Sequence, residues 1–135
     1  MATDPVTGGI THLRVYFSDT DQMGVVYHSV YLTWFEIGRT ELLRDRGMAY
    51  AAVEARGVSL PVTEATFRVR QPAVYDDWIR IESTVASVRT REVRFDYRIW
   101  RGDALLVEGT TTHVAVTKAT RRAARIPEWL LERLT

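Results

Sequence analysis

The feature that most constrains the fold is a long apolar segment over residues 29–46, whose length and spacing predict a helix. Ser29 or a neighbour is expected to cap its start, and Gly47 is expected to end it. The first half is apolar on nearly all sides, so the helix must be enclosed by other elements instead of lying on a surface. Its apolar positions are Val30, Tyr31, Leu32, Trp34, Phe35, Ile37, Leu42 and Leu43.

Most of the remaining chain alternates apolar and polar residues, which predicts strands over residues 11–17, 58–70, 78–88, 92–101 and 104–117. The clearest alternation is VRFDYRI, in which Val93, Phe95, Tyr97 and Ile99 share one face. Within 58–70 the apolar phase slips by one near Thr63 or Glu64, which predicts a bulge or bend. Gly109 is a second candidate for a bulge or bend.

The connections carry their own signals. RGD, at residues 101–103, is a natural hairpin turn, and MAYAAVEARG is a short helical or irregular segment. In IPEWLLERL, Pro127 stands at the start of a short amphipathic helix. Residues 1–9 are expected to form a fraying tail.

This order of elements predicts an α+β fold, in which a curved antiparallel sheet of about five strands wraps one long helix. The 135 residues fit a single domain, 1–135. Such a sheet shields only one side of the helix and leaves its own edges open, so self-association is expected, with a homodimer as the minimum.

Composition excludes several classes of function. The net charge of +1 gives no electrostatic case for nucleic acid or an anionic membrane surface. Without cysteine there is no disulfide, thiol nucleophile or thiolate metal site, which suits a cytoplasmic protein. No run of eighteen apolar residues is present, so we expect no membrane insertion.

Common catalytic motifs are also missing. There is no G-x-S-x-G elbow and no phosphate-binding glycine loop, and the three histidines lack zinc-ligand spacing. Asp19, Asp21 and Gly24 match part of a calcium loop, but Met23 and Val30 stand where oxygen ligands are required. We therefore expect neither a metal nor a cofactor.

In the stretch SDTDQMGVVYHS, two aspartates stand just before the predicted start of the long helix. Unpaired N–H groups at a helix start can hold an oxyanion, and Asp19 or Asp21 can act as nucleophile or general base. The alternative is that both aspartates only form turns. His28 is either an acid or base or a solvated residue, and the aromatic residues Tyr27 and Tyr31 are either core or pocket.

The string RVYFSDTDQMGVVYHSVYLTWFEIGRTELLR resembles the signature of the 4-hydroxybenzoyl-CoA thioesterase family. The similarity is strongest to the branch of small bacterial acyl-CoA thioesterases associated with Tol-Pal gene clusters. It continues through RVRQPAVYDDWIRIES, FDYRIWR, EGTTTHVAVT and RIPEWLL, so it spans about residues 13–131. It implies a hotdog fold, in which dimers or tetramers place active sites at subunit interfaces.

The resemblance also implies roles for individual residues. Asp21 corresponds to the catalytic carboxylate and the backbone N–H of His28 to the carbonyl donor, while Asp19 keeps a structural role. The residues expected against the substrate are Gly24, Val25, Tyr27 and Tyr31. Glu36 and Glu64 are minor alternatives for the catalytic carboxylate.

The implied function is acyl-CoA thioester hydrolysis, with acyl-CoA as the small-molecule partner and no cofactor. The alternative is a non-catalytic acyl-CoA-binding or sensor protein; a dehydratase is disfavoured because its His and Glu pattern is absent. The arginines considered for the CoA phosphates, which are otherwise solvated surface, are Arg89, Arg91, Arg121, Arg122 and Arg125.

Overall fold

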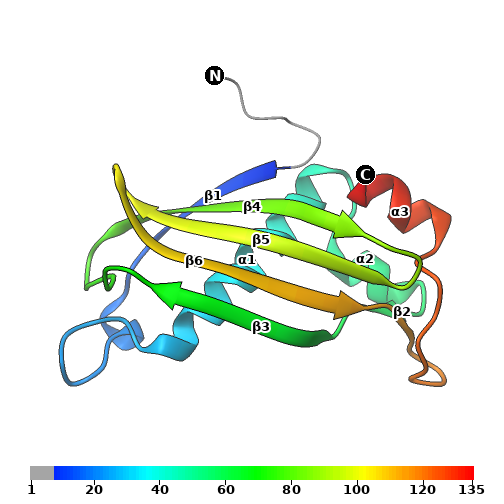
Figure 1. The fold of residues 1–135 in the computed structure, drawn as a ribbon, viewed down its shortest axis with the longest axis horizontal. Helices are drawn as coiled ribbons and strands as arrows, with labels where there is room; N and C mark the ends of the chain where they lie inside the picture. Colours follow the sequence, from blue (N-terminus) through cyan, green and yellow to red (C-terminus); the bar gives the residue numbers. More distant parts are fainter. Residues whose placement is uncertain (1–7) are drawn as a thin grey trace.

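A five-stranded antiparallel sheet packs against one side of a long helix, as a computed structural model of the chain shows for residues 8–135 (Figure 1). The helices are α1 (His28–Asp45), α2 (Tyr50–Ala55) and α3 (Glu128–Leu134), with a 3₁₀ turn, η1 (Phe17–Asp19), before α1. The strands are β1 (Gly8–Arg14), β2 (Val58–Ser59), β3 (Val62–Val69), β4 (Trp78–Val88), β5 (Glu92–Arg101), β6 (Ala104–Val114) and β7 (Val116–Thr117). The predicted α+β arrangement is confirmed.

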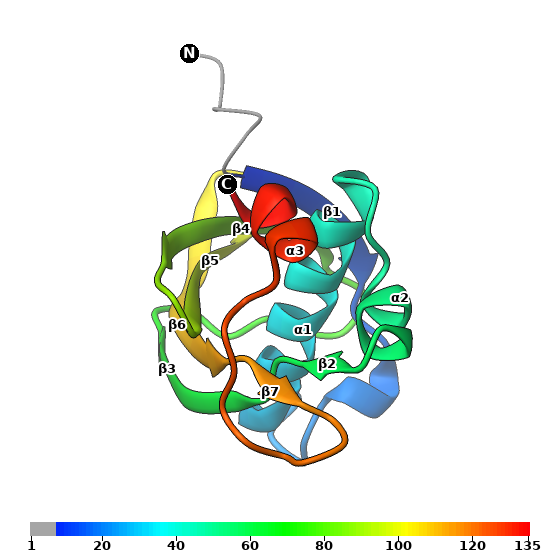
Figure 2. The same cartoon turned by 90° about the vertical axis from the view of Figure 1, so that its right-hand side faces the viewer.

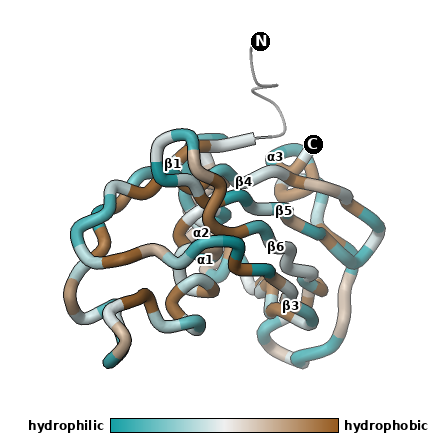
Figure 3. The backbone as a smooth tube through the Cα atoms, turned by 60° about the vertical axis from the view of Figure 1, so that its left-hand side comes forward, coloured by the Kyte–Doolittle hydropathy of each residue, from teal (hydrophilic) through white to brown (hydrophobic). Residues whose placement is uncertain are grey.

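The strands of the large sheet lie in the order β1-β4-β5-β6-β3, and β2 pairs with β7 separately. Viewed from the end, the sheet curves around α1 (Figure 2). Hydrophobic and hydrophilic residues alternate along its strands (Figure 3), as the sequence pattern requires. The register shift between Val62 and Glu64 confirms the predicted bulge or bend.

Helix α1 turns one apolar stripe toward the sheet. Tyr31, Trp34, Phe35, Gly38 and Leu42 recur three or four residues apart and are buried. On the other side, the side chains of Leu32 and Tyr27 are 38% and 48% exposed. A single copy of the chain therefore covers only part of the helix, as expected for a sheet of this size.

The core is densest where Phe35 meets the sheet. Its ring stacks on Tyr97, with 4.3 Å between ring centroids, and meets Phe67 edge to face. Gly109 pairs regularly with both Phe67 and Tyr97, so the predicted bulge or bend at Gly109 is wrong. A Cβ at Gly109 would lie 2.5 Å from Cζ of Phe35, so the glycine permits close approach of this ring.

Two predictions at the N-terminal end are corrected. Residues 1–7 of the expected tail lie outside the described residues, but Gly8 and Gly9 begin β1 by pairing with β4. Strand pairing of this kind uses backbone groups only, so glycines give no side-chain signal for it. The first strand ends at Arg14 instead of residue 17, because Phe17 starts η1 and is 75% exposed.

Two predicted strands are each divided in the structure. Leu60 separates β2 from β3: its N–H donates to the Tyr50 hydroxyl, and its carbonyl contacts the His113 ring. Ala115 separates β6 from β7, because its N–H donates to the carbonyl of Arg91. These contacts take the backbone of Leu60 and Ala115 out of the sheet ladders.

Candidate active site

The two aspartates lie in a small hairpin that leads into α1. The N–H of Tyr27 donates to the Asp19 carbonyl at 2.9 Å, and the N–H of Asp21 donates to the Val25 carbonyl at 2.8 Å. Gly24 closes the turn with a φ of +81°, a conformation that favours glycine. The start of the helix and Asp21 are therefore held by one local backbone network.

The two carboxylates have different partners. Oδ2 of Asp19 accepts the Tyr16 N–H at 2.9 Å, which fixes η1. Oδ1 of Asp21 accepts the Met23 N–H at 2.8 Å and the Val25 N–H at 3.4 Å. Oδ2 of Asp21 has no hydrogen-bond partner within residues 8–135. Asp21 is partly exposed, so this oxygen is available to a bound molecule.

The start of α1 has no side-chain cap. Tyr27 occupies the N-cap position without a side-chain hydrogen bond, and no acidic residue lies in the first turn. His28 is the first helical residue, so its N–H has no partner within the helix. The helix start therefore offers partial positive charge to an approaching oxygen atom.

The predicted substrate contacts fall into two groups. Gly24 and Tyr27 are exposed. Val25 is partly buried, and its backbone pairs with that of Val74 in an isolated antiparallel bridge. Tyr31 instead is only 1% exposed, and its hydroxyl accepts the Ala73 N–H at 3.1 Å. Burial raises the pKa of this hydroxyl, which stays protonated at neutral pH. The structure thus gives Tyr31 a structural contact, leaves Gly24 and Tyr27 exposed, and leaves Val25 partly exposed.

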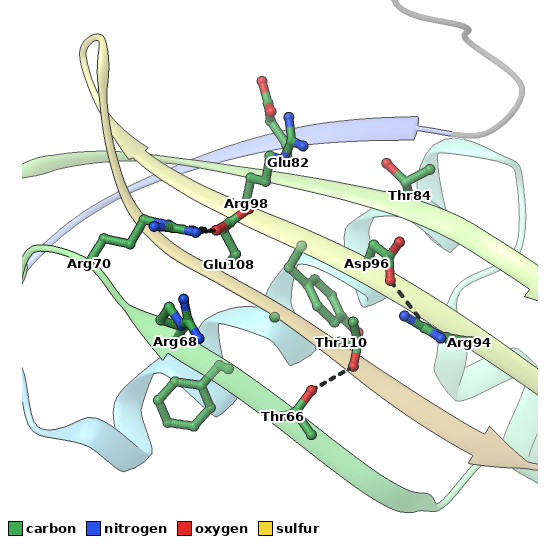
Figure 4. Close-up of a pocket in the computed structure, with 13 residues that line it drawn as sticks. Thr66, Arg68, Arg70, Glu82, Thr84, Arg94, Asp96, Arg98, Glu108 and Thr110 are labelled. Carbon is green, nitrogen blue, oxygen red and sulfur yellow. Dashed lines mark hydrogen bonds and ion pairs between the residues drawn. The ribbon is translucent and has the colours of Figure 1, made fainter.

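A hollow of about 670 Å³ lies on the face of the sheet away from α1 (Figure 4). Charges of both signs line it: Arg70 pairs with Glu108, their Nε and Oε2 atoms 2.6 Å apart, and Arg94 lies 3.4 Å from Asp96. Neither Asp21 nor His28 lines this hollow. Its polar lining does not suit an apolar acyl group.

A smaller cavity of about 250 Å³ lies between α1 and the segment that joins α2 to β3. It is lined by Glu36, Arg39, Thr40, Leu43, Tyr50, Leu60, Pro61, Val62, Phe95 and His113. Asp21 and His28 do not line it either. Glu36, one minor catalytic alternative, therefore lies at a cavity, whereas Glu64, the other, is exposed on the edge strand β3.

His113 lines the small cavity, and sequence reasoning did not single it out. It is 1% exposed, and its ring contacts Thr111 through Nε2 and the Leu60 carbonyl through Nδ1, both at 2.8 Å. Burial lowers the pKa of His113 to about 4, so the ring is neutral at physiological pH. Its place on the apolar face of a strand, in phase with Thr111, is the sequence signal for a buried role.

The five arginines considered for the CoA phosphates lie in two segments, the turn between β4 and β5 and the segment between β7 and α3. The turn carrying Arg89 and Arg91 meets the segment after β7, because the Ile126 N–H donates to the Thr90 carbonyl at 2.9 Å. The Ala115 N–H joins the same turn through the Arg91 carbonyl. All five side chains are exposed, so each is open to anions.

Residues 8–135 contain no group of three or more His, Asp or Glu side chains placed to hold a metal ion. Within the same residues, no helix has the length and apolarity needed to cross a membrane.

Comparison with known sequences identifies the family. Residues 15–134 match the thioesterase-like superfamily. Acyl-CoA thioester hydrolase YbgC from Escherichia coli O157:H7 is 33% identical over 117 residues, which cover 86% of this chain and 87% of that protein. Acyl-CoA thioesterase YbgC from Haemophilus influenzae is 30% identical over 117 residues, covering 86% of each.

Solved structures agree. A hypothetical protein from Thermus thermophilus is similar with a TM-score of 0.89 and 40% identity, covering 93% of this chain and 95% of that one. DHNA-CoA thioesterase from Staphylococcus aureus is similar with a TM-score of 0.88 and 26% identity, and the match covers 93% of this chain and 87% of that one. The hotdog fold expected from the sequence is confirmed. The chain therefore belongs to the thioesterase-like superfamily and has the hotdog fold, and its curated relatives include acyl-CoA thioester hydrolases.

Proposed function

We propose that the protein hydrolyses an acyl-CoA thioester to a carboxylate and free CoA, with Asp21 as the catalytic carboxylate. The observation that carries this proposal is that the two carboxylate oxygens of Asp21 differ in their contacts. Oδ1 accepts hydrogen bonds from backbone N–H groups of the turn, while Oδ2 has no partner among residues 8–135. The two YbgC relatives, named for acyl-CoA thioester hydrolysis, support the reaction class. They also support membership of the small bacterial branch that the sequence resembles.

The uncapped start of α1 supplies the second half of the proposed site. The thioester carbonyl oxygen accepts a hydrogen bond from the His28 N–H, and negative charge that develops on this oxygen is stabilised by the helix start. Removing one such donor from an enzyme typically lowers kcat by about 100 to 1,000-fold. Gly24, Val25 and Tyr27 lie around the same turn and contact the bound substrate.

Asp21 acts by one of two routes. As a nucleophile, it attacks the carbonyl carbon, the C–S bond breaks, and water then hydrolyses the acyl-aspartate. As a general base, it takes a proton from a water molecule whose oxygen attacks the carbonyl carbon directly. In both routes the sulfur leaves as CoA thiolate and takes up a proton, and the acyl group leaves as a carboxylate. Neither route draws on a metal or redox cofactor.

The exposed arginines of these two segments support recognition of the CoA phosphates. Guanidinium groups bind phosphate oxygens through paired hydrogen bonds, and all five arginines are exposed. Phosphate contacts of this kind hold substrate and transition state equally well. Losing them is therefore expected to raise KM more than it lowers kcat.

Self-association forms part of the proposal. Apolar side chains around the Asp21 hairpin are exposed, including Phe17 at 75%, Met23 at 84% and Tyr75 at 57%. Exposed apolar clusters of this kind mark surfaces that bind another molecule. A homodimer or homotetramer would cover them together with the open side of α1, and we propose such an assembly in the cytoplasm.

Thiol release from short-chain, long-chain and aromatic acyl-CoAs tests the function. The native protein is expected to turn over at least one of them, and Asp21→Asn to lower kcat by about 1,000-fold, within the range for loss of acid–base catalysis. If the native protein releases no CoA from any substrate, or if Asp21→Asn matches it, the proposal fails. Binding without turnover would instead favour the sensor function.

A further inference from the structure

A short segment between β3 and β4, residues 73–77, contacts both halves of the proposed site. Its first residue, Ala73, is 0% exposed and is bound on two sides. The Ala73 carbonyl accepts the N–H of Val26, in the hairpin that carries the two aspartates, at 2.9 Å. The Ala73 N–H donates to the hydroxyl of Tyr31, a residue of the first turn of α1, at 3.1 Å. The 73–77 segment therefore joins the hairpin to the helix start.

Val25 connects this segment to Asp21. The backbone of Val25 pairs with Val74 in the antiparallel bridge described above. The Val25 carbonyl accepts the Asp21 N–H at 2.8 Å, and the Val25 N–H donates to Oδ1 of Asp21 at 3.4 Å. A displacement of Val74 would therefore move Asp21 relative to the His28 N–H, which belongs to α1 and is held by the packing of that helix.

Asp77 holds both backbone groups of Val74. Oδ2 of Asp77 accepts the Val74 N–H at 2.9 Å, and the Asp77 N–H donates to the Val74 carbonyl at 3.2 Å. Asp76, inside this turn, has a φ of +71°, a left-handed conformation that is strained for a residue with a side chain. The contacts of Asp77 therefore stabilise a turn that the backbone alone does not favour.

Arg101, the last residue of β5, anchors the Asp77 carboxylate to the large sheet. A guanidinium N–H of Arg101 donates to Oδ2 of Asp77 at 2.7 Å, and the same nitrogen lies 3.5 Å from the Pro72 carbonyl oxygen. The Asp77 side chain is only 14% exposed, so water screens this ion pair less than a pair on the open surface. One carboxylate oxygen thus joins the sheet to the 73–77 segment.

We infer that Asp77 is a positioning residue for the hydrolysis. Together with Arg101 it holds the 73–77 segment, so that the free oxygen of Asp21 and the His28 N–H keep the separation that one thioester carbonyl requires. The inference rests on the proposed thioesterase function, and Asp77 does not itself touch the substrate. A misplacement of reacting groups by about 1 Å can lower the rate about 100-fold. Loss of Asp77 should therefore lower kcat more than it changes KM.

Two substitutions of different severity test this role on the acyl-CoA that the native protein turns over fastest. Asp77→Ala removes the acceptor and should lower kcat by about 10- to 100-fold, with KM within about 2-fold of native. Asp77→Asn retains an oxygen that accepts the Val74 N–H, so its loss should be smaller than that of Asp77→Ala. Glu108→Gln, in an exposed ion pair with Arg70, is the control and should keep kcat within about 2-fold.

The Asp21→Asn background separates positioning from loss of folded protein. If Asp77 acts through Asp21, Asp77→Ala should change the residual kcat of Asp21→Asn by less than about 2-fold. A smaller folded fraction would instead lower kcat by the same factor in both backgrounds. Arg101→Met leaves the 73–77 segment itself unchanged and should show the same pattern, so it carries the test if Asp77→Ala does not fold. Equal losses in both backgrounds, or native kcat in Asp77→Ala and Arg101→Met, would overturn the inference.

Amide hydrogen exchange gives a measurement that does not depend on activity. The Val26 N–H, which is bound to the Ala73 carbonyl, should exchange at least about 10-fold faster in Asp77→Asn or Arg101→Met, while the Tyr97 N–H in the middle of β5 should not change. Unchanged exchange at Val26 would overturn the inference and leave the thioesterase function intact. Absence of turnover by the native protein with every acyl-CoA would instead refute the proposed function, and with it the role of Asp77.

Discussion

Gly38 marks the closest approach of α1 to the sheet, and Gly38→Ala tests that packing. A Cβ at this position would overlap Oγ of Ser83 and lie 2.9 Å from Cγ2 of Ile81. Both neighbours belong to β4 and are buried, Ile81 at 0% and Ser83 at 1% exposure. Neither is the free end of a flexible surface side chain, so helix and sheet must separate to admit the methyl group.

Two opposing effects set the magnitude for Gly38→Ala. Alanine is favoured over glycine inside a helix by about 1 kcal/mol. Overpacking a close-packed core destabilises by about 1–3 kcal/mol, and two rigid contacts place this position near the upper value. The net expectation is a loss of about 2 kcal/mol, or about 6–10 °C in Tm for a domain of this size.

Urea unfolding of Gly38→Ala, Ser83→Ala and the double variant measures these effects. Oγ of Ser83 is buried without a hydrogen-bond partner among residues 8–135, so Ser83→Ala alone should cost less than about 1 kcal/mol. In the double variant one clash is absent, so the coupling energy should be at least about 1 kcal/mol. If Gly38→Ala is as stable as the native protein, the packing described here is wrong.

Two further predictions concern buried polar groups. Tyr31→Phe leaves the Ala73 N–H without its acceptor and should destabilise by about 1–3 kcal/mol in urea unfolding, whereas the exposed Tyr27→Phe should change little. The pKa of His113 is about 4 in the folded protein against 6.5 for the free side chain, so the unfolded chain binds the extra proton first. Stability is fully present above pH 6.5 and falls as pH drops toward 4, by about 3 kcal/mol from this residue. His113→Asn should flatten this pH dependence, and an equally steep profile would contradict the assignment.

The parts of the fold that sequence predicts well are those governed by local periodicity. The predicted bounds of β4 and β5 agree with the structure, because every second residue from Ile79 to Val85 and from Val93 to Ile99 is buried. Helix α1 begins one residue before the predicted start and ends one residue early. Gly47 has a φ of +84° just beyond it, as a helix-ending glycine requires.

The errors occur where distant backbone groups decide the structure. Gly8 and Gly9 become a strand only because β4 offers them an edge. Leu60 leaves the sheet because of its contacts with Tyr50 in α2 and His113 in β6, which lie 10 and 53 residues away in sequence. Gly109 leaves room for the ring of Phe35, a helix residue far away in sequence. No local pattern around these positions contains that information.

The same distinction applies to the candidate site. The hairpin from Asp19 to Tyr27 is contiguous in sequence, so its turn and helix start can be predicted from one string of residues. The small cavity instead joins Arg39, Phe95 and His113 from three elements. These residues become one arrangement only after α1, β5 and β6 have packed together.

The central claim, that Asp21 carries the hydrolysis, is tested most directly by comparing Asp21→Asn with Asp19→Asn on the substrate that the native protein turns over fastest. Asparagine removes the charge in both variants but retains an oxygen that accepts the Met23 or Tyr16 N–H, so both turns are preserved. The account predicts that kcat/KM falls by about 1,000-fold for Asp21→Asn and by less than about 10-fold for Asp19→Asn. Equal losses in the two variants, or native activity in Asp21→Asn, would contradict it.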